Sequence, residues 1–288
     1  MAFPLDPYPK VIITAALTGM LPARAQTPHV PLTEDEIVAD ALACGAAGAA
    51  IVHVHVRDED GKPDYRAERY GRIIRAIRAE SDLLICASTS ARVYQEYEKR
   101  AEVLDLEGEE KADLASLTAG SFNFPTQASV NSPDTIFRLT ETMIARGIKP
   151  EIEVFDAGML NYAKYLDRKL DLPKPLCFSL LLGSLGGIPG RPGDLAYLVR
   201  DLPDACVWSA TGVGSFQLPI NVAALVEGGG VRVGLEDNLY YDHDRRELAT
   251  NRRLVERIVR IANELQRAVA TPDEARVMLG LPVASARK

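Results

Sequence analysis

Eight short apolar runs recur along this chain of 288 residues, and their spacing limits the possible folds more than any other feature. The runs are KVIITAAL, AAIVHVHV, LLICAS, ADLASLT, PEIEVF, LCFSLLL, ACVWSA and VRVGLE. Most of them are rich in β-branched residues, and all are short enough to be strands. Amphipathic segments lie between most of the runs, and they predict helices over residues 34–48, 65–80, 134–147, 158–170, 193–202, 251–270 and 272–280.

Strands that alternate with helices pair in parallel through helical crossovers. The number of elements and the chain length favour an α/β fold of the (β/α)8 TIM barrel type over an open doubly wound sheet. No Gly-x-Gly-x-x-Gly follows the first run, which weakens the case for a dinucleotide-binding fold. The chain has no obvious linker, so we expect a single barrel domain over residues 1–288 with a C-terminal helical extension.

The net charge argues against a nucleic-acid partner, and the cysteine pattern indicates a reducing compartment. A net charge of −7 argues against a nucleic-acid surface, which needs a basic face. The four cysteines are scattered without a CxxC pair, which is typical of reduced thiols in a cytosol. The N-terminus does not resemble a signal peptide, and no run approaches the roughly 18 apolar residues of a membrane span. We therefore expect a cytoplasmic protein with no nucleic-acid and no membrane partner.

Two of the four histidines lie two residues apart in the second run, AAIVHVHVRDEDGKPD. Side chains alternate between the faces of a strand, so His53, His55 and Arg57 share the inner face while the valines between them face the helices. Two imidazoles at this spacing can hold one metal ion, and functional sites of barrels lie at the C-terminal ends of the strands. Histidines that are merely hydrogen-bonded in the core remain the alternative.

A zinc site usually needs a third ligand, and the eighth run, VRVGLEDN, offers one. Its alternation places Arg232 and Glu236 on the inner face, with Asp237 at the tip. The second and eighth strands of a barrel both flank the first, so Glu236 could reach the two histidines. A purely structural ion pair of Arg232 with Glu236 or Asp237 is the alternative.

Other strand ends carry polar groups as well. The fifth run turns Glu151 and Glu153 inward, and two acids inside a barrel are costly unless they are paired or functional. Hydroxyl groups end the third and fourth runs, and glycine turns follow the sixth and seventh; the positions are Ser88–Ser90, Ser116, Thr118, Gly212 and Gly214. Hydroxyls of this kind can simply bond to backbone, and glycine turns are common, although such turns can also cradle an anion.

These residues alone support one metal ion in the barrel mouth with an open coordination position. Such an ion polarises a carbonyl or activates water. Asp237, beside a ligand and near Arg232, is a plausible base. Carbon–carbon chemistry through an enolate and hydrolysis both remain possible at this point.

The chain resembles the β-keto acid cleavage enzymes, whose founding activity is 3-keto-5-aminohexanoate cleavage. The likeness runs nearly end to end and rests on IITAALTG, HVHVRDEDGKPD, ASLTAGSFNF, PEIEVFDAGM, LLGSLGGIPG, VRVGLEDNLYY and ATPDEAR, in that order. It implies a zinc-dependent (β/α)8 enzyme that reacts a β-keto acid with acetyl-CoA to give acetoacetate and a new acyl-CoA. It also implies a homo-oligomer, often a tetramer.

The resemblance assigns roles to individual residues. His53, His55 and Glu236 match the zinc ligands. Asp237, supported by Arg232, matches the group that takes the proton between the ketone and the carboxylate. The positions that contact or orient the substrate and intermediates are matched by Ser88, Ser116 and Glu153, with Ser116 standing where the founding activity has a threonine, and we expect further substrate contacts from Thr14, Leu21, Thr118, Gly212 and Gly214.

Two departures from the founding pattern concern the substrate. Leu21 stands where the founding enzyme has a glutamate that pairs with the amino group of its substrate, and a leucine cannot neutralise an ammonium. We therefore expect a tail that is apolar or uncharged. The segment STSAR replaces STGG, and Arg92 within it could meet an anionic substrate or CoA, or could simply be solvated.

Two rival functions are consistent with parts of the sequence. A metal-dependent hydrolase barrel also uses a His-x-His pair with a late acid, but it usually carries the pair on the first strand and adds later histidines. A non-catalytic barrel that binds metal or acyl-CoA would keep the ligands and have no need of a base at Asp237.

Overall fold

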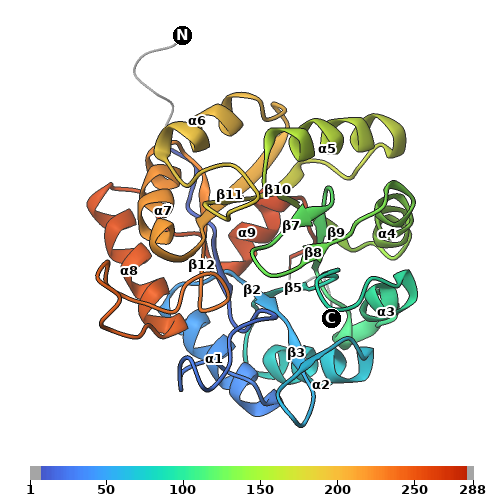
Figure 1. Ribbon diagram of the computed structural model, residues 1–288, viewed down its shortest axis with the longest axis horizontal. Helices are drawn as coiled ribbons and strands as arrows, with labels where there is room; N and C mark the ends of the chain where they lie inside the picture. Colours follow the sequence, from blue (N-terminus) through green and yellow to red (C-terminus); the bar gives the residue numbers. More distant parts are fainter. Residues whose placement is uncertain (1–7, 284–288) are drawn as a thin grey trace.

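The expected strands form a closed parallel barrel in the computed structural model, which describes residues 8–283. The barrel order is β1-β12-β11-β10-β9-β6-β5-β2, and β1 closes the ring by pairing with both β12 and β2 (Figure 1). The bounds are β1 Ile13–Ala16, β2 Ile51–Val54, β5 Leu84–Ala87, β6 Leu114–Thr118, β9 Lys149–Val154, β10 Leu176–Leu182, β11 Cys206–Gly212 and β12 Gly230–Val233. Eight parallel strands with interleaved helices confirm the TIM barrel that the periodicity predicts.

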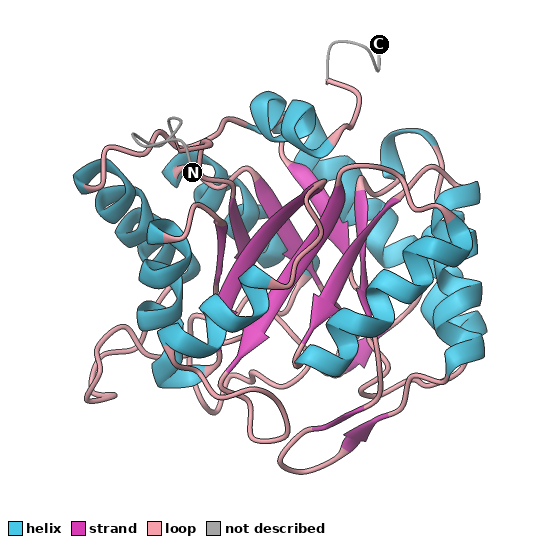
Figure 2. Ribbon diagram, turned by 90° about the horizontal axis from the view of Figure 1, so that it is seen from above, coloured by secondary structure: helices cyan, strands magenta, loops and turns pink. Residues whose placement is uncertain are grey.

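Helices surround the barrel and cover the outer faces of its strands (Figure 2). Their bounds are α1 Glu34–Ala47, α2 Ala67–Glu80, α3 Tyr97–Ala101, α4 Pro133–Ala145, α5 Ala157–Leu170, α6 Pro192–Arg200, α7 Gln217–Val226, α8 Asn251–Glu264 and α9 Pro272–Leu279. A capping box of Thr33 with Glu36 begins α1, and the Ser132 side chain caps the start of α4. Within residues 8–283, no helix is both long and apolar enough to cross a membrane.

The helices differ from the sequence predictions in two ways: α3 and α7 were not predicted, and one helix is shorter than expected. Helix α7 carries no capping side chain at Phe216 and is nearly apolar throughout, so it gives neither of the signals that mark a helix start or an amphipathic face. The helix expected over residues 251–270 ends at Glu264. Beyond it Gln266 takes a positive φ of 56°, and the chain runs on to an isolated bridge between Val269 and Val11.

The two ends of the barrel differ, because α9 closes one of them. Its Ala275 and Leu279 belong to an apolar cluster with residues at the starts of the strands, among them Ile12, Ala50 and Leu84. Figure 1 shows α9 at the centre of the ring of strands, and Figure 2 shows the barrel arrowheads pointing toward a common end. The carboxyl ends of the strands, where barrel sites lie, are therefore left for loops and for the hairpins β3–β4 (Val56–Arg57 with Pro63–Asp64) and β7–β8 (Phe122–Asn123 with Ala128–Ser129).

Close packing determines the course of the chain just after β12. Gly234 has a φ of 154°, and a Cβ built there would lie 1.9 Å from the carbonyl oxygen of Ala16. Asn251 Oδ1 accepts a hydrogen bond from the Leu235 peptide N–H at 2.7 Å, and Asn251 Nδ2 donates to Leu17 O at 2.9 Å. The two residues that follow Leu235 are thereby held against the end of β1.

Replacing Gly234 with alanine tests this packing. We expect Gly234→Ala to lower the free energy of unfolding by more than about 3 kcal/mol, because the methyl group overlaps backbone atoms that cannot move aside. Urea denaturation measures the change. Gly193→Ala is the matched control, since a Cβ there meets nothing within 4 Å, and it should leave stability unchanged or slightly raised. Equal effects of the two variants would contradict the proposed constraint.

Candidate functional site

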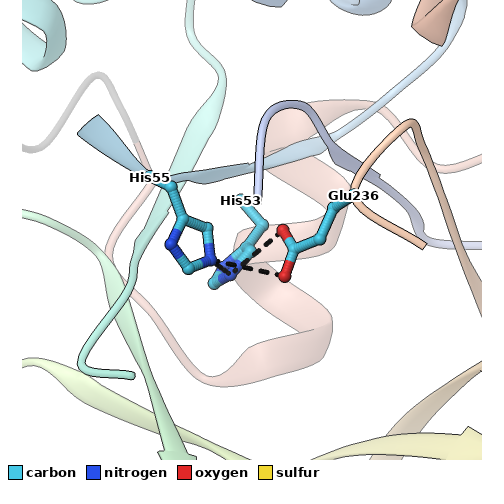
Figure 3. A group of neighbouring side chains, drawn as sticks. All are labelled: His53, His55 and Glu236. Atoms are coloured by element: carbon cyan, nitrogen blue, oxygen red, sulfur yellow. Dashed lines mark hydrogen bonds and ion pairs between the residues drawn. The ribbon is translucent and has the colours of Figure 1, made fainter. Parts of the chain in front are cut away.

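Two imidazoles and one carboxylate converge at the carboxyl end of the barrel (Figure 3). His53 Nε2 and His55 Nε2 are 3.1 Å apart. Glu236 Oε1 lies 3.3 Å from His55 Nε2, and Glu236 Oε2 lies 3.7 Å from His53 Nε2. β1 lies between β2 and β12 and pairs Ala16 in register with His53, so residues far apart in the sequence meet as the periodicity predicts.

The separations of these atoms fit a shared metal ion. Ligand atoms of a tetrahedral site with metal–nitrogen bonds of about 2.0–2.1 Å stand roughly 3.3 Å apart, which lies inside the observed range. Glu236 Oε2 is buried with no hydrogen-bond partner among residues 8–283, an expensive state for a carboxylate oxygen. The donor set therefore suits a divalent transition metal, which would use that oxygen.

The protonation states of His53 and Glu236 also suit a metal. Burial lowers the pKa of His53 to about 3, so the imidazole is neutral and its nitrogen lone pair is available. Burial alone would raise the pKa of Glu236. The charge of Arg232, the largest opposing effect, outweighs burial and lowers the pKa well below its usual value, so Glu236 is a carboxylate.

A second group that could hold a metal lies beside the first and consists of His53, Cys86 and Glu151. Burial raises the pKa of the Cys86 thiol well above its usual value, and burial raises the pKa of Glu151 to about 7. The thiol lies 3.4 Å from Glu151 Oε2. Two groups held in their protonated forms are poor ligands, so the set with Glu236 is the better metal centre.

One buried arginine connects the acids of this end of the barrel. Arg232 is 1% exposed, and its Nη2 lies 2.9 Å from Glu236 Oε1 while its Nε lies 2.9 Å from Asp237 Oδ2. Its Nη1 approaches Glu153 Oε1 at 3.4 Å. Burial lowers the pKa of Arg232, but the charges of these three carboxylates outweigh it and raise the pKa well above its usual value. Burial raises the pKa of Asp237, although Arg232 opposes the rise.

The remaining polar strand ends are also ordered. Thr118 Oγ1 donates a hydrogen bond of 2.8 Å to Glu153 Oε2. Ser116 Oγ accepts one from the Thr89 peptide N–H at 3.3 Å, and Ser88 Oγ accepts one from the Ser90 N–H at 3.2 Å. The hydroxyl groups of Ser88 and Ser116 thus keep their own protons free to donate into the cavity.

A cavity of about 430 Å³ contains most of the predicted site residues. It is lined by His53, His55, Ser88, Ser116, Thr118, Glu153, Arg232, Glu236 and Asp237, and also by Leu21, Arg92 and Gly214. Two predicted substrate contacts do not line it: Thr14 is buried in β1 beside Arg232, and Gly212 packs against the Phe216 carbonyl, where a Cβ would lie at 2.1 Å. Their place in the structure argues for a packing function.

Loop residues complete the cavity, and sequence reasoning missed most of them. They include Met20, Phe124, Pro125, Leu185 and Arg245. For the loop after β1, which carries Leu21, the sequence offered one signal: Arg57 was expected on the inner face of the second strand. Its guanidinium donates to Gly19 O at 2.6 Å and Pro22 O at 3.2 Å, and so it holds the loop that carries Leu21.

The comparisons with known proteins agree with this arrangement. The family described as beta-keto acid cleavage enzyme (BKACE) matches residues 10–281. A 3-keto-5-aminohexanoate cleavage enzyme from Fusobacterium nucleatum is 41% identical over 275 residues, which are 94% of this chain and 98% of the relative. A 3-oxoadipate:acetyl-CoA acetyltransferase from Cupriavidus necator is 36% identical over 276 residues, 94% of this chain and 95% of that one.

A solved structure supports the fold. The apo structure of ObcA superposes with a TM-score of 0.80 at 21% identity, covering 88% of this chain and 66% of that chain. This chain therefore spans about two thirds of the length of that protein.

The metal centre can be tested by removing its ligands. We expect one divalent metal ion per chain in the wild type. We expect His53→Ala or His55→Ala to weaken binding by more than the 10- to 100-fold that loss of an outer-shell partner typically costs. Equilibrium dialysis with Zn²⁺ and elemental analysis measure both. His29→Ala and His243→Ala are matched controls, because neither histidine lines the cavity. A stoichiometry that is the same in all four variants would contradict the assignment.

Proposed function

This chain belongs to the beta-keto acid cleavage enzyme family, and we propose that its cavity joins a β-keto acid to acetyl-CoA and releases acetoacetate and a new acyl-CoA. The observation that carries the proposal is the pair of neighbouring acids after β12. Arg232 holds Glu236 toward the histidines and Asp237 in the same cavity.

We assign the metal site to His53, His55 and Glu236, and we propose zinc as the ion. When bound there, zinc would supply a Lewis acid that polarises the ketone and carboxylate oxygens of the keto acid. The protein's own contribution is to keep the His53 imidazole neutral and the Glu236 carboxylate charged in a buried site.

Asp237 is the proposed base for the carbon between the ketone and the carboxylate. It takes one proton from that carbon, and the guanidinium of Arg232 at 2.9 Å stabilises the charges that change during the transfer. The carbanion then forms a bond to the acetyl carbonyl carbon, and CoA leaves as its thiolate. The same thiolate attacks the original ketone, the bond between that ketone and the former carbanion carbon breaks, and a returned proton completes acetoacetate.

The other polar groups are proposed to orient the reactants. Glu153 is restrained by Thr118 on one side and faces Arg232 on the other, so its carboxylate keeps one direction in the cavity. Ser88 and Ser116 accept backbone hydrogen bonds and can donate their own protons to a substrate carboxylate.

Leu21 limits the charge that the tail of the substrate can carry. It lines the cavity where the founding pattern has an acid, so a cationic tail would have no partner from this position. The names of the relatives cover keto acids with cationic and with anionic tails, so family membership leaves the tail open. From Leu21 alone we propose the apolar or uncharged tail that the sequence predicts. A leucine argues only against a positive charge, so a keto diacid is also compatible with this position.

Removing the base tests the mechanism. We expect wild-type enzyme with a β-keto acid and acetyl-CoA to form acetoacetate, and we expect Asp237→Asn to lower kcat by at least about 100-fold while the metal content is unchanged. Mass spectrometry of both products measures the rates, and the exposed Asp244 supplies the control Asp244→Asn.

Two results would contradict the proposal. If the Asp237→Asn enzyme turns over at the wild-type rate, Asp237 is not the catalytic base. Consumption of the keto acid by water without any need for acetyl-CoA would instead favour the metal-dependent hydrolase.

A further inference from the structure

Three arginines line the cavity, and they differ in their partners. Arg232 contacts three carboxylates. Arg245 is exposed at the mouth, in the turn that follows the site acids. Arg92 is partly buried, and across residues 8–283 its guanidinium makes no hydrogen bond or ion pair. The guanidinium is partly shielded from water and has no acceptor among residues 8–283, so it is free to bind an anionic group that enters the cavity.

The position of Arg92 is well defined. Its Cζ lies 3.3 Å from the centroid of the Phe124 ring. Its peptide N–H donates to Ser90 Oγ at 3.2 Å, and its carbonyl accepts from Gln127 Nε2 at 3.1 Å. A guanidinium stacked on a ring keeps its N–H groups in the ring-parallel plane, where they can bind a planar carboxylate through two hydrogen bonds.

The acids of the cavity do not satisfy this arginine. Burial lowers the pKa of Arg92, and the charges of Glu236, Glu153 and Asp237 only partly oppose that effect. All three carboxylates already contact Arg232. The cavity thus contains a positioned cation that, among residues 8–283, pairs directly with no carboxylate.

The cavity that Arg92 lines also offers apolar groups that suit an aliphatic chain. Met20, Leu21 and Pro125 line the same cavity with apolar groups, and none of them can pair with a cation. Such a wall accepts methylene groups, while the guanidinium accepts a negative charge at their end. An ammonium at that end would face Arg92 with no acid from position 21 to offset the repulsion.

We infer that the substrate is a β-keto diacid, whose second carboxylate is bound by Arg92 at the far end of the tail. This inference rests on the proposed function, and it replaces the uncharged tail expected from Leu21 with an anionic tail, which a leucine at that position also permits. The C2–C3 bond of the diacid would break as proposed above, and the acyl-CoA product would retain the free carboxylate.

Three keto acids with six carbon atoms separate the possibilities. They are 3-oxoadipate with an anionic end, 3-oxohexanoate with a methyl group in place of that carboxylate, and 3-keto-5-aminohexanoate with a cationic tail. With acetyl-CoA and the metal-loaded enzyme, we expect kcat/KM for the diacid to exceed that for 3-oxohexanoate by on the order of 10- to 100-fold. We expect the amino acid to react more slowly still.

Variants of Arg92 identify the residue responsible. We expect Arg92→Met to lower kcat/KM for 3-oxoadipate by on the order of 10- to 100-fold, to change 3-oxohexanoate by less than about 3-fold, and to leave KM for acetyl-CoA unaltered. Arg92→Lys should restore part of the loss, because a lysine keeps the charge without the bidentate geometry. Calorimetric binding of 3-oxoadipate without acetyl-CoA should weaken by a similar factor in Arg92→Met.

A matched control comes from α4. Arg138 is also stacked on an aromatic ring, with its Cζ 3.7 Å from the Tyr97 centroid, but it does not line the cavity. Arg138→Met should therefore behave as wild type with all three keto acids. If Arg92→Met does not fold, the order of the three substrates in the wild type still tests the inference.

Several outcomes would overturn the inference while the proposed function stands. A wild-type preference for 3-oxohexanoate would show that the tail is uncharged. A raised KM for acetyl-CoA in Arg92→Met would place CoA at this arginine, and an equal loss with both keto acids would place the common carboxylate there. If the preference for 3-oxoadipate over 3-oxohexanoate is lost in Arg245→Met and kept in Arg92→Met, then Arg245 at the cavity mouth binds the second carboxylate. Failure of every keto acid to yield acetoacetate would instead overturn the proposed function.

Discussion

The ion pairs of the buried Arg232 are the interactions on which the rest of the site depends. One guanidinium holds Glu236, Asp237 and Glu153 in a region where an unpaired carboxylate would be protonated or would turn away. Glu236 and Asp237 are adjacent in sequence, and both are bound by this guanidinium: Nη2 lies 2.9 Å from Glu236 Oε1, while Nε and Nη2 donate to the two oxygens of Asp237. The strand end can therefore supply both a metal ligand and a base.

The residues proposed for the reaction and those proposed to select the substrate lie on different parts of the barrel. Strand ends carry the imidazoles and the acids, and these positions are tied together by the parallel pairing of β12, β1 and β2. Loops supply the cavity wall, including Leu21 and Arg92. Because α9 closes the opposite end of the barrel, both sets of residues face the same opening. A change of loop sequence can alter the substrate while the strand ends stay as they are.

Period-two alternation was enough to predict the strands, the meeting of His53 with Glu236 and the inward direction of Arg232. It could not predict α7, whose sequence is apolar on all sides. It also could not predict the end of α8, because the chain beyond it pairs through Val269 with Val11, just before β1. The placement of Arg92 was equally hidden, because its stacking partner comes from a different loop and only tertiary contacts bring them together. The roles given to the site residues remain proposals.

Isotopic labelling tests the central claim most directly, namely that Asp237 and the groups held by Arg232 make a carbon–carbon bond. The enzyme would be given unlabelled keto acid and acetyl-CoA with ¹³C in both acetyl carbons, and the products would be analysed by NMR. The account predicts acetoacetate labelled at its ketone and methyl carbons, together with an acyl-CoA free of label in the acyl group. Labelled acetate, or acetoacetate without label, would contradict it.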